Sequence, residues 1–71
     1  MIKARLEAMG VNVIDAQIIS SADFYIGNAD QFIGCVKKFG IANIYLDDSD
    51  KRCTYYFVHN NRVFCHGEEP E

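Results

Sequence analysis

Residues 53–67 read CTYYFVHNNRVFCHG and predict a β-hairpin. Asn60 and Asn61 separate two short runs of aromatic and β-branched residues, and asparagine tolerates the positive φ of a two-residue type I′ turn. We therefore expect strands over residues 53–59 and 62–66. A turn at this position sets three pairs of residues opposite each other: Phe57 and Phe64, Tyr55 and His66, and His59 and Arg62.

The same turn decides which side chains share a face of the sheet, because side chains alternate along a strand. The six paired residues lie on one face, which we expect to be the core. We also expect residues 41–46 to form a strand whose Leu46 pairs with Cys53. The core face then gains Ala42, Ile44 and Leu46, and the second face holds Asn43, Tyr45, Thr54, Tyr56, Val58, Val63 and Cys65.

A central helix is predicted over residues 29–39. Asn28 and Gln31 resemble a capping box at its start, and Gly40 is a typical C-cap at its end. Phe32, Cys35, Val36 and Phe39 form the apolar stripe that would cover the core face of the sheet.

The N-terminal part of the chain predicts a second, shorter helix over residues 1–9. Gly10 again occupies the C-cap position, and Val11 could close against Leu6. A strand is expected over residues 13–19, a turn over 20–23 and a very short strand over 24–26.

Together these elements predict an α+β fold, with an antiparallel sheet of four or five strands packed on the central helix. The N-terminal helix is expected at the sheet edge or on its second face. Residues 1–67 form a single domain in this prediction, and residues 68–71 are an acidic C-terminal tail.

Composition narrows the classes of function. The chain of 71 residues is 49% hydrophobic and 13% aromatic, which is typical of one small globular domain and not of a disordered tail. Its net charge of −3 disfavours direct binding of nucleic acid. The charged residues Lys3, Arg5 and Glu7 interrupt the apolar residues at the N-terminus, so we expect no signal peptide, no membrane segment and a cytoplasmic protein.

Cys35, Cys53 and Cys65 are an odd number of cysteines, and we expect buried thiols and no disulfide. Cys53 and Cys65 would point to opposite faces of the sheet, so no zinc site, other metal site or cofactor is expected. Cys53, His66 and Glu68 would fall on one face near one end of the sheet, and a thiol enzyme that uses Cys53 and His66 is the weakest of the functional alternatives. The chain has no phosphate-binding glycine loop or nucleophile elbow, so we expect no catalysis.

The charge map points to a docking surface. An acidic loop and an acidic tail leave the predicted sheet at one end, beside the tyrosine-bearing second face. Acidic side chains would speed encounter with a basic partner and aromatic side chains would hold it, although such a loop could also serve solubility alone. The predicted partner-binding residues are Tyr45, Asp47, Asp48, Asp50, Tyr56, Glu68 and Glu69.

The function predicted from the sequence is a small non-catalytic protein-binding module that occupies a basic surface of a larger protein. Inhibitors of the phage anti-defence type (anti-CRISPR or anti-restriction), immunity proteins and antitoxins are examples of this class. The alternative is a homo-oligomeric structural subunit, possible as a homodimer, that buries its tyrosine-rich face against a copy.

Overall fold

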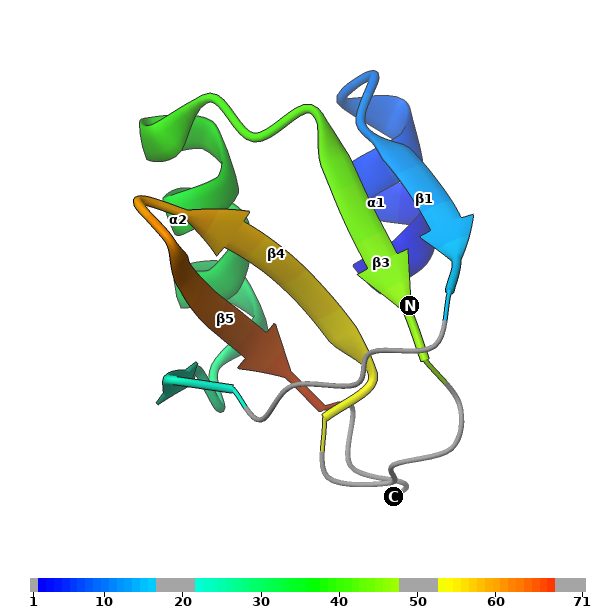
Figure 1. Cartoon of the computed structure of the whole chain (residues 1–71). Helices are drawn as coiled ribbons and strands as arrows, with labels where there is room; N and C mark the ends of the chain where they lie inside the picture. The colour runs from blue at the N-terminus through cyan, green and yellow to red at the C-terminus, as the bar shows by residue number, and fades with distance from the viewer. Residues whose placement is uncertain (1, 17–21, 48–52, 68–71) are drawn as a thin grey trace.

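The computed structural model describes residues 2–16, 22–47 and 53–67. Two helices and five strands form an α+β fold, as the sequence predicts (Figure 1). The elements in chain order are α1 (Ile2–Ala8), β1 (Asn12–Asp15), β2 (Phe24–Tyr25), α2 (Ala29–Phe39), β3 (Asn43–Leu46), β4 (Tyr55–His59) and β5 (Arg62–His66).

The strands form one sheet in the order β1-β3-β4-β5-β2. Its three central strands are antiparallel, which confirms the predicted hairpin and the strand that precedes it. The two edge strands are parallel to their neighbours, β1 to β3 and β2 to β5, so the sheet is mixed. Parallel pairing needs a crossover connection, and α2 lies in the chain between β1 and β3.

The hairpin register is the predicted one. Asn60 and Asn61 both have positive φ, 52° and 61°, and Phe57 lies opposite Phe64. The expected pairing of Leu46 with Cys53 is wrong, because Leu46 lies opposite Tyr55. The error is two residues, an even number, so the paired residues of β3 and β4 keep their predicted faces.

The turn supplies a stability prediction. Asn61→Val should lower the free energy of unfolding by about 1–2 kcal/mol, because a β-branched side chain is strained at positive φ. Asn61→Gly is the matched variant, since glycine adopts this conformation freely, and it should leave stability unchanged or raise it. Urea unfolding of both variants measures the difference. Equal midpoints would mean that the turn is not of type I′.

Both helices cover the same face of the sheet, and Figure 1 shows α1 and α2 behind it as drawn. The core contains residues from α1, α2 and the central strands in one cluster: Ile2, Leu6, Val11, Phe32, Ile33, Val36, Ile44, Tyr55 and Phe57. Of the two positions expected for the N-terminal helix, the second face is wrong and the sheet edge is right, because α1 lies on the same face as α2 and packs against the edge strand β1. The apolar residues Ile2 and Leu6 of α1 join the cluster formed by α2, so no helix of the described residues covers the other face of the sheet.

The helix ends follow the predicted chemistry. The side-chain oxygen of Asn28 accepts a hydrogen bond of 3.0 Å from the backbone N–H of Gln31 and caps α2. Gly10 and Gly40 have φ of 83° and 65°, the left-handed conformation of a C-cap. An ion pair of 2.8 Å joins Arg5 of α1 to Asp30 of α2, but both side chains are exposed, so it contributes less than about 1 kcal/mol.

Several strands are shorter than predicted. Of the strand expected over residues 13–19, the structure shows Asn12–Asp15, and residues 17–19 lie outside the described part of the chain. β3 begins at Asn43 because the N–H of Ile41 instead bonds to the carbonyl of Val36 at the end of α2. β4 begins at Tyr55, so Cys53 lies outside the strand. The side chain of Cys53 therefore need not follow the alternation of side chains between the two faces of the sheet.

Candidate functional site

One continuous row of side chains crosses the face that carries no helix. The strand registers place Ile14, Tyr45, Tyr56, Cys65 and Tyr25 side by side, one from each strand in sheet order. We call this side of the sheet the helix-free face. By the same registers it also holds Asn12, Asn43, Val58 and Val63, so its strand residues include no charged side chain.

Large apolar side chains are exposed on this face. The exposed fractions are 41% for Ile14, 53% for Tyr25 and 54% for Val58. Tyr45 and Val63 are half-buried. Because each of these side chains is apolar or aromatic, the helix-free face offers contact area to a partner without the cost of removing a charge from water.

Two residues of the predicted docking surface are not exposed. Tyr56 lies on the expected face, on the central strand between Tyr45 and Cys65, but is only 5% exposed. Asp47 is 6% exposed, and its backbone N–H donates a 2.9 Å hydrogen bond to the carbonyl of Thr54. The expected exposure of Tyr56 and Asp47 is therefore wrong, whereas Tyr45 keeps part of its surface in contact with solvent.

The remaining acidic residues of the prediction, Asp48, Asp50, Glu68 and Glu69, lie outside the described residues. Leu46, Tyr55 and His66 stand in one row across three strands. Asp47 and Gly67 follow the first and last members of that row, so the acidic loop and the acidic tail both begin at this end of the sheet. Their common origin agrees with the predicted charge map, and their contact with a partner stays a prediction.

Cys53 and Cys65 form a disulfide, with their Cα atoms 5.6 Å apart. The prediction of free thiols is thus wrong for these two residues and right for Cys35. The predicted opposition of the two side chains required Cys53 to lie within a regular strand. It lies two residues before β4, so its side chain can turn to the helix-free face and meet Cys65.

His66 is on the core face and 2% exposed. Its Nδ1 lies 2.7 Å from the carbonyl oxygen of Ile26, and since a carbonyl only accepts, Nδ1 donates this hydrogen bond. The His66 ring also stacks on Phe32, with ring centroids 5.3 Å apart. The predicted meeting of Cys53 and His66 is therefore wrong, because Cys53 is bonded to Cys65 and His66 holds β5 to the segment between β2 and α2.

Among residues 2–16, 22–47 and 53–67, no group of three or more His, Cys, Asp or Glu side chains could hold a metal ion. No helix in that part of the chain is long and apolar enough to cross a membrane.

Three exposed apolar residues of the helix-free face, Ile14, Tyr25 and Val58, were missed as contact residues in the sequence. Alternation along the hairpin already placed Val58 on this face, and only its exposure was unknown. Tyr25 could not be placed, because its position depends on the parallel pairing of β2 with Cys65 and its neighbours, 40 residues further along the chain. No local pattern signals a pairing over that separation.

No protein-family model, curated protein or solved structure matches this chain. Its function must therefore be inferred from its own residues.

Proposed function

We propose that the chain is a small non-catalytic protein-binding module, which docks on a larger protein through the helix-free face. Inhibition is the expected consequence: the module occupies a basic surface of that protein, as anti-defence, immunity and antitoxin proteins do. The observation that carries the proposal is the exposure of Tyr25 and Val58 on a sheet face that no helix covers. Exposed apolar side chains gathered on one face are typical of interaction surfaces.

Charge supports a basic partner. The chain carries ten acidic and seven basic side chains, and five of the carboxylates follow Asp47 and Gly67 in the two acidic segments. Charges at the rim of an interface mainly raise the rate of association, whereas buried aromatic contacts mainly slow dissociation. The acidic segments would thus speed association with the partner, and the uncharged helix-free face would slow dissociation.

The test of the contact face uses two neighbouring residues of β2. Tyr25 and Phe24 have similar exposed fractions, 53% and 43%, but Tyr25 lies beside Cys65 on the helix-free face and Phe24 stacks on Phe64 on the opposite one. A partner is retrieved with the immobilised chain from a lysate of the source organism, and its affinity for purified variants is then measured. Tyr25→Ala should weaken binding by about tenfold or more, mainly through faster dissociation.

Phe24→Ala is the matched control and should weaken binding by no more than about twofold. Thermal melting of each variant shows that loss of binding is not loss of folding. Equal effects of the two substitutions, or a larger effect of Phe24→Ala, would refute docking through the helix-free face.

The charge test reverses Asp48 and Asp50 to Lys. Asp47 is left unchanged because it is buried. The reversed protein should associate more slowly with the same partner, and its affinity should depend less steeply on salt than that of the wild type. An unchanged association rate would mean that the acidic loop serves solubility alone.

A homo-oligomer that buries the helix-free face against a copy is the second candidate. The absence of charge among the strand residues of this face favours it, because such a face can meet itself without repulsion. Light scattering separates the two candidates. A docking module should have the mass of one chain, 8.1 kDa, and a homodimer twice that mass.

A further inference from the structure

The outer edge of β1 has backbone groups that point away from the sheet. Asn12 donates its N–H to the carbonyl of Ala42, and Ala16 donates its N–H to Leu46, at 2.9 and 3.1 Å. Alternate residues of a parallel strand face the same neighbour, so Ile14 also faces β3, whereas Val13 and Asp15 face outward. β1 is the terminal strand of the sheet, and no described residue bonds to the outward N–H and C=O groups of these two residues.

The edge strand β1 is four residues long and carries one charge, Asp15, but it has no lysine, proline or bulge to prevent a further strand from adding to the sheet. Such edges are commonly protected by lysine, proline or a bulge. The residues of β1 are Asn12, Val13, Ile14 and Asp15, and their pairing with β3 is continuous. Within the described part of the chain, the edge is therefore open to a further strand.

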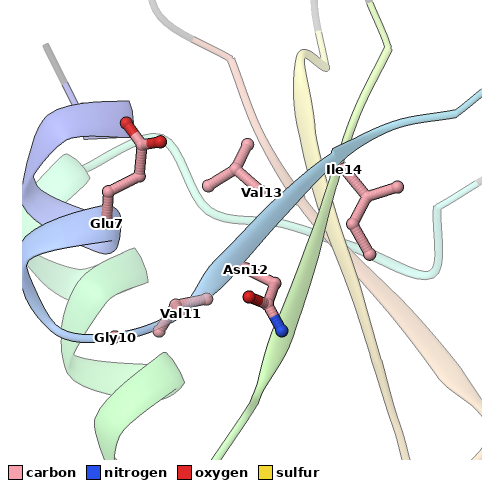
Figure 2. A pocket seen from close by; sticks show the side chains of 6 residues that line it. All are labelled: Glu7, Gly10, Val11, Asn12, Val13 and Ile14. Atoms are coloured by element: carbon pink, nitrogen blue, oxygen red, sulfur yellow. The ribbon is translucent and has the colours of Figure 1, made fainter.

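A groove of about 500 Å³ runs along the same edge. Its walls come from α1, the turn after it and β1, with no residue from β3: Glu7, Gly10, Val11, Asn12, Val13 and Ile14. Figure 2 shows Val13 on the α1 side of β1, and Asn12 and Ile14 on the other side. An added strand would therefore place alternate side chains beside Glu7 and beside Ile14.

We propose that the free edge of β1 binds an extended, basic segment of a partner protein, which adds to the sheet as a sixth strand. The segment carries Lys or Arg at two positions separated by one apolar residue. The basic side chains lie opposite Val13 and Asp15 on the α1 side, and the apolar side chain lies opposite Ile14 on the helix-free face. Main-chain hydrogen bonds to Val13 and Asp15 hold the segment, and side-chain contacts select it.

Charge decides between a basic segment and a second copy of this chain. Asp15 alternates onto the same side of β1 as Val13, so it lies on the α1 side together with the exposed Glu7. Pairing of β1 with a second β1 would bring the Asp15 of one copy toward the Glu7 of the other. The repulsion between these two negative charges opposes such a pairing. Arg5 does not relieve this repulsion, because it pairs with Asp30. Lys3, one helical turn from Glu7, forms no ion pair with Glu7 or Asp15.

This inference rests on the proposed function only in taking the partner to be basic, and it concerns a different surface. The probe is a synthetic peptide, acetyl-Thr-Lys-Val-Lys-Val-Lys-Thr-amide, added to the purified chain labelled for NMR. Its binding should slow hydrogen exchange of the Val13 and Asp15 amides about tenfold when the free peptide is at ten times its Kd. The amide of Ile14 already bonds to β3, so its exchange should not change.

Two matched controls separate strand addition from general attraction of a cation to an acidic protein. N-methylation of the lysine amides removes the donors that meet β1 if the segment runs antiparallel to it, and N-methylation of the valine amides removes them if it runs parallel. One of the two modified peptides should therefore abolish the slowing, and the other should not. In the protein, Val13→Pro removes an outward N–H without breaking a hydrogen bond between β1 and β3. In this variant the peptide should no longer slow hydrogen exchange of the Asp15 amide. Glu7→Gln should weaken binding severalfold, and Asp30→Asn should not.

Three results would each overturn the proposal. The first is no binding at millimolar peptide, and the second is binding that leaves the Val13 and Asp15 amides unchanged. The third is protection of these amides in the chain alone, together with a doubled mass, since a second copy would then occupy the edge. The peptide test needs no natural partner, so its failure leaves the Tyr25 test of the helix-free face intact, and the reverse also holds.

Discussion

Phe57→Ala is expected to lower the free energy of unfolding by about 3–5 kcal/mol, the usual cost of removing a buried aromatic ring. Phe57 is fully buried on the central strand. Its ring centroid lies 4.9 Å from that of Phe64, 5.3 Å from Phe32 and 6.2 Å from Phe39. These contacts confirm the prediction that Phe39 lies on the stripe of α2 that covers the face of Phe57 and Phe64. One substitution would remove contacts to β5 and to both ends of α2.

This loss is large for so short a chain. A domain of this length has a total stability of roughly 4–11 kcal/mol, so the variant should be partly or wholly unfolded at room temperature. Val58→Ala is the control: it changes the next residue, which points to the exposed face, and should shift stability by less than about 0.5 kcal/mol. Chemical denaturation followed by circular dichroism measures both. Equal losses for the two variants would mean that the faces of β4 are exchanged.

Loss of the Cys53–Cys65 disulfide is expected to cost about 3 kcal/mol. The bond closes a loop with a sequence separation of 12 residues, and such a crosslink stabilises mainly by restricting the unfolded chain. Cys53→Ser is the preferred variant, because Cys53 is only half-buried whereas Cys65 is fully buried. A reducing agent should destabilise the wild type by a similar amount and leave Cys53→Ser unchanged.

Thiol titration in denaturant tests the same bond chemically. Protein purified without reductant should show one reactive thiol per chain, that of Cys35. Cys35→Ser is the control and should show none while keeping its sensitivity to reductant. Three thiols in the unreduced wild type would contradict the bond.

Local chemistry made most of the fold predictable. The Asn60–Asn61 turn fixed the hairpin register, and the cap residues Asn28 and Gly40 fixed the bounds of α2. The parallel pairings of β1 and β2 were not predictable, because each joins segments about 30 to 40 residues apart whose choice of neighbour depends on the packed core. The choice between the sheet edge and the second face for α1 stayed open in the sequence for the same reason.

The candidate site was less predictable than the fold. Alternation identified the face that holds Tyr45, Tyr56 and Val58, but exposure depends on what covers each residue. Tyr56, on the central strand, is buried, and Val58, two residues further along the same strand, is exposed. The disulfide was missed because it depends on where the regular strand begins, and Cys53 lies two residues before the start of β4.

The central claim is that a partner covers the helix-free face, and hydroxyl-radical footprinting of the free and partner-bound chain measures it most directly. Oxidation of Tyr25 and Val58 should slow severalfold in the complex, because a bound protein excludes water from its contact surface. Phe24 lies on the opposite face and Met9 follows the end of α1. Their oxidation should proceed at the same rate in the complex as in the free protein. Protection of Phe24 or Met9 with unchanged oxidation of Tyr25 and Val58 would contradict the account.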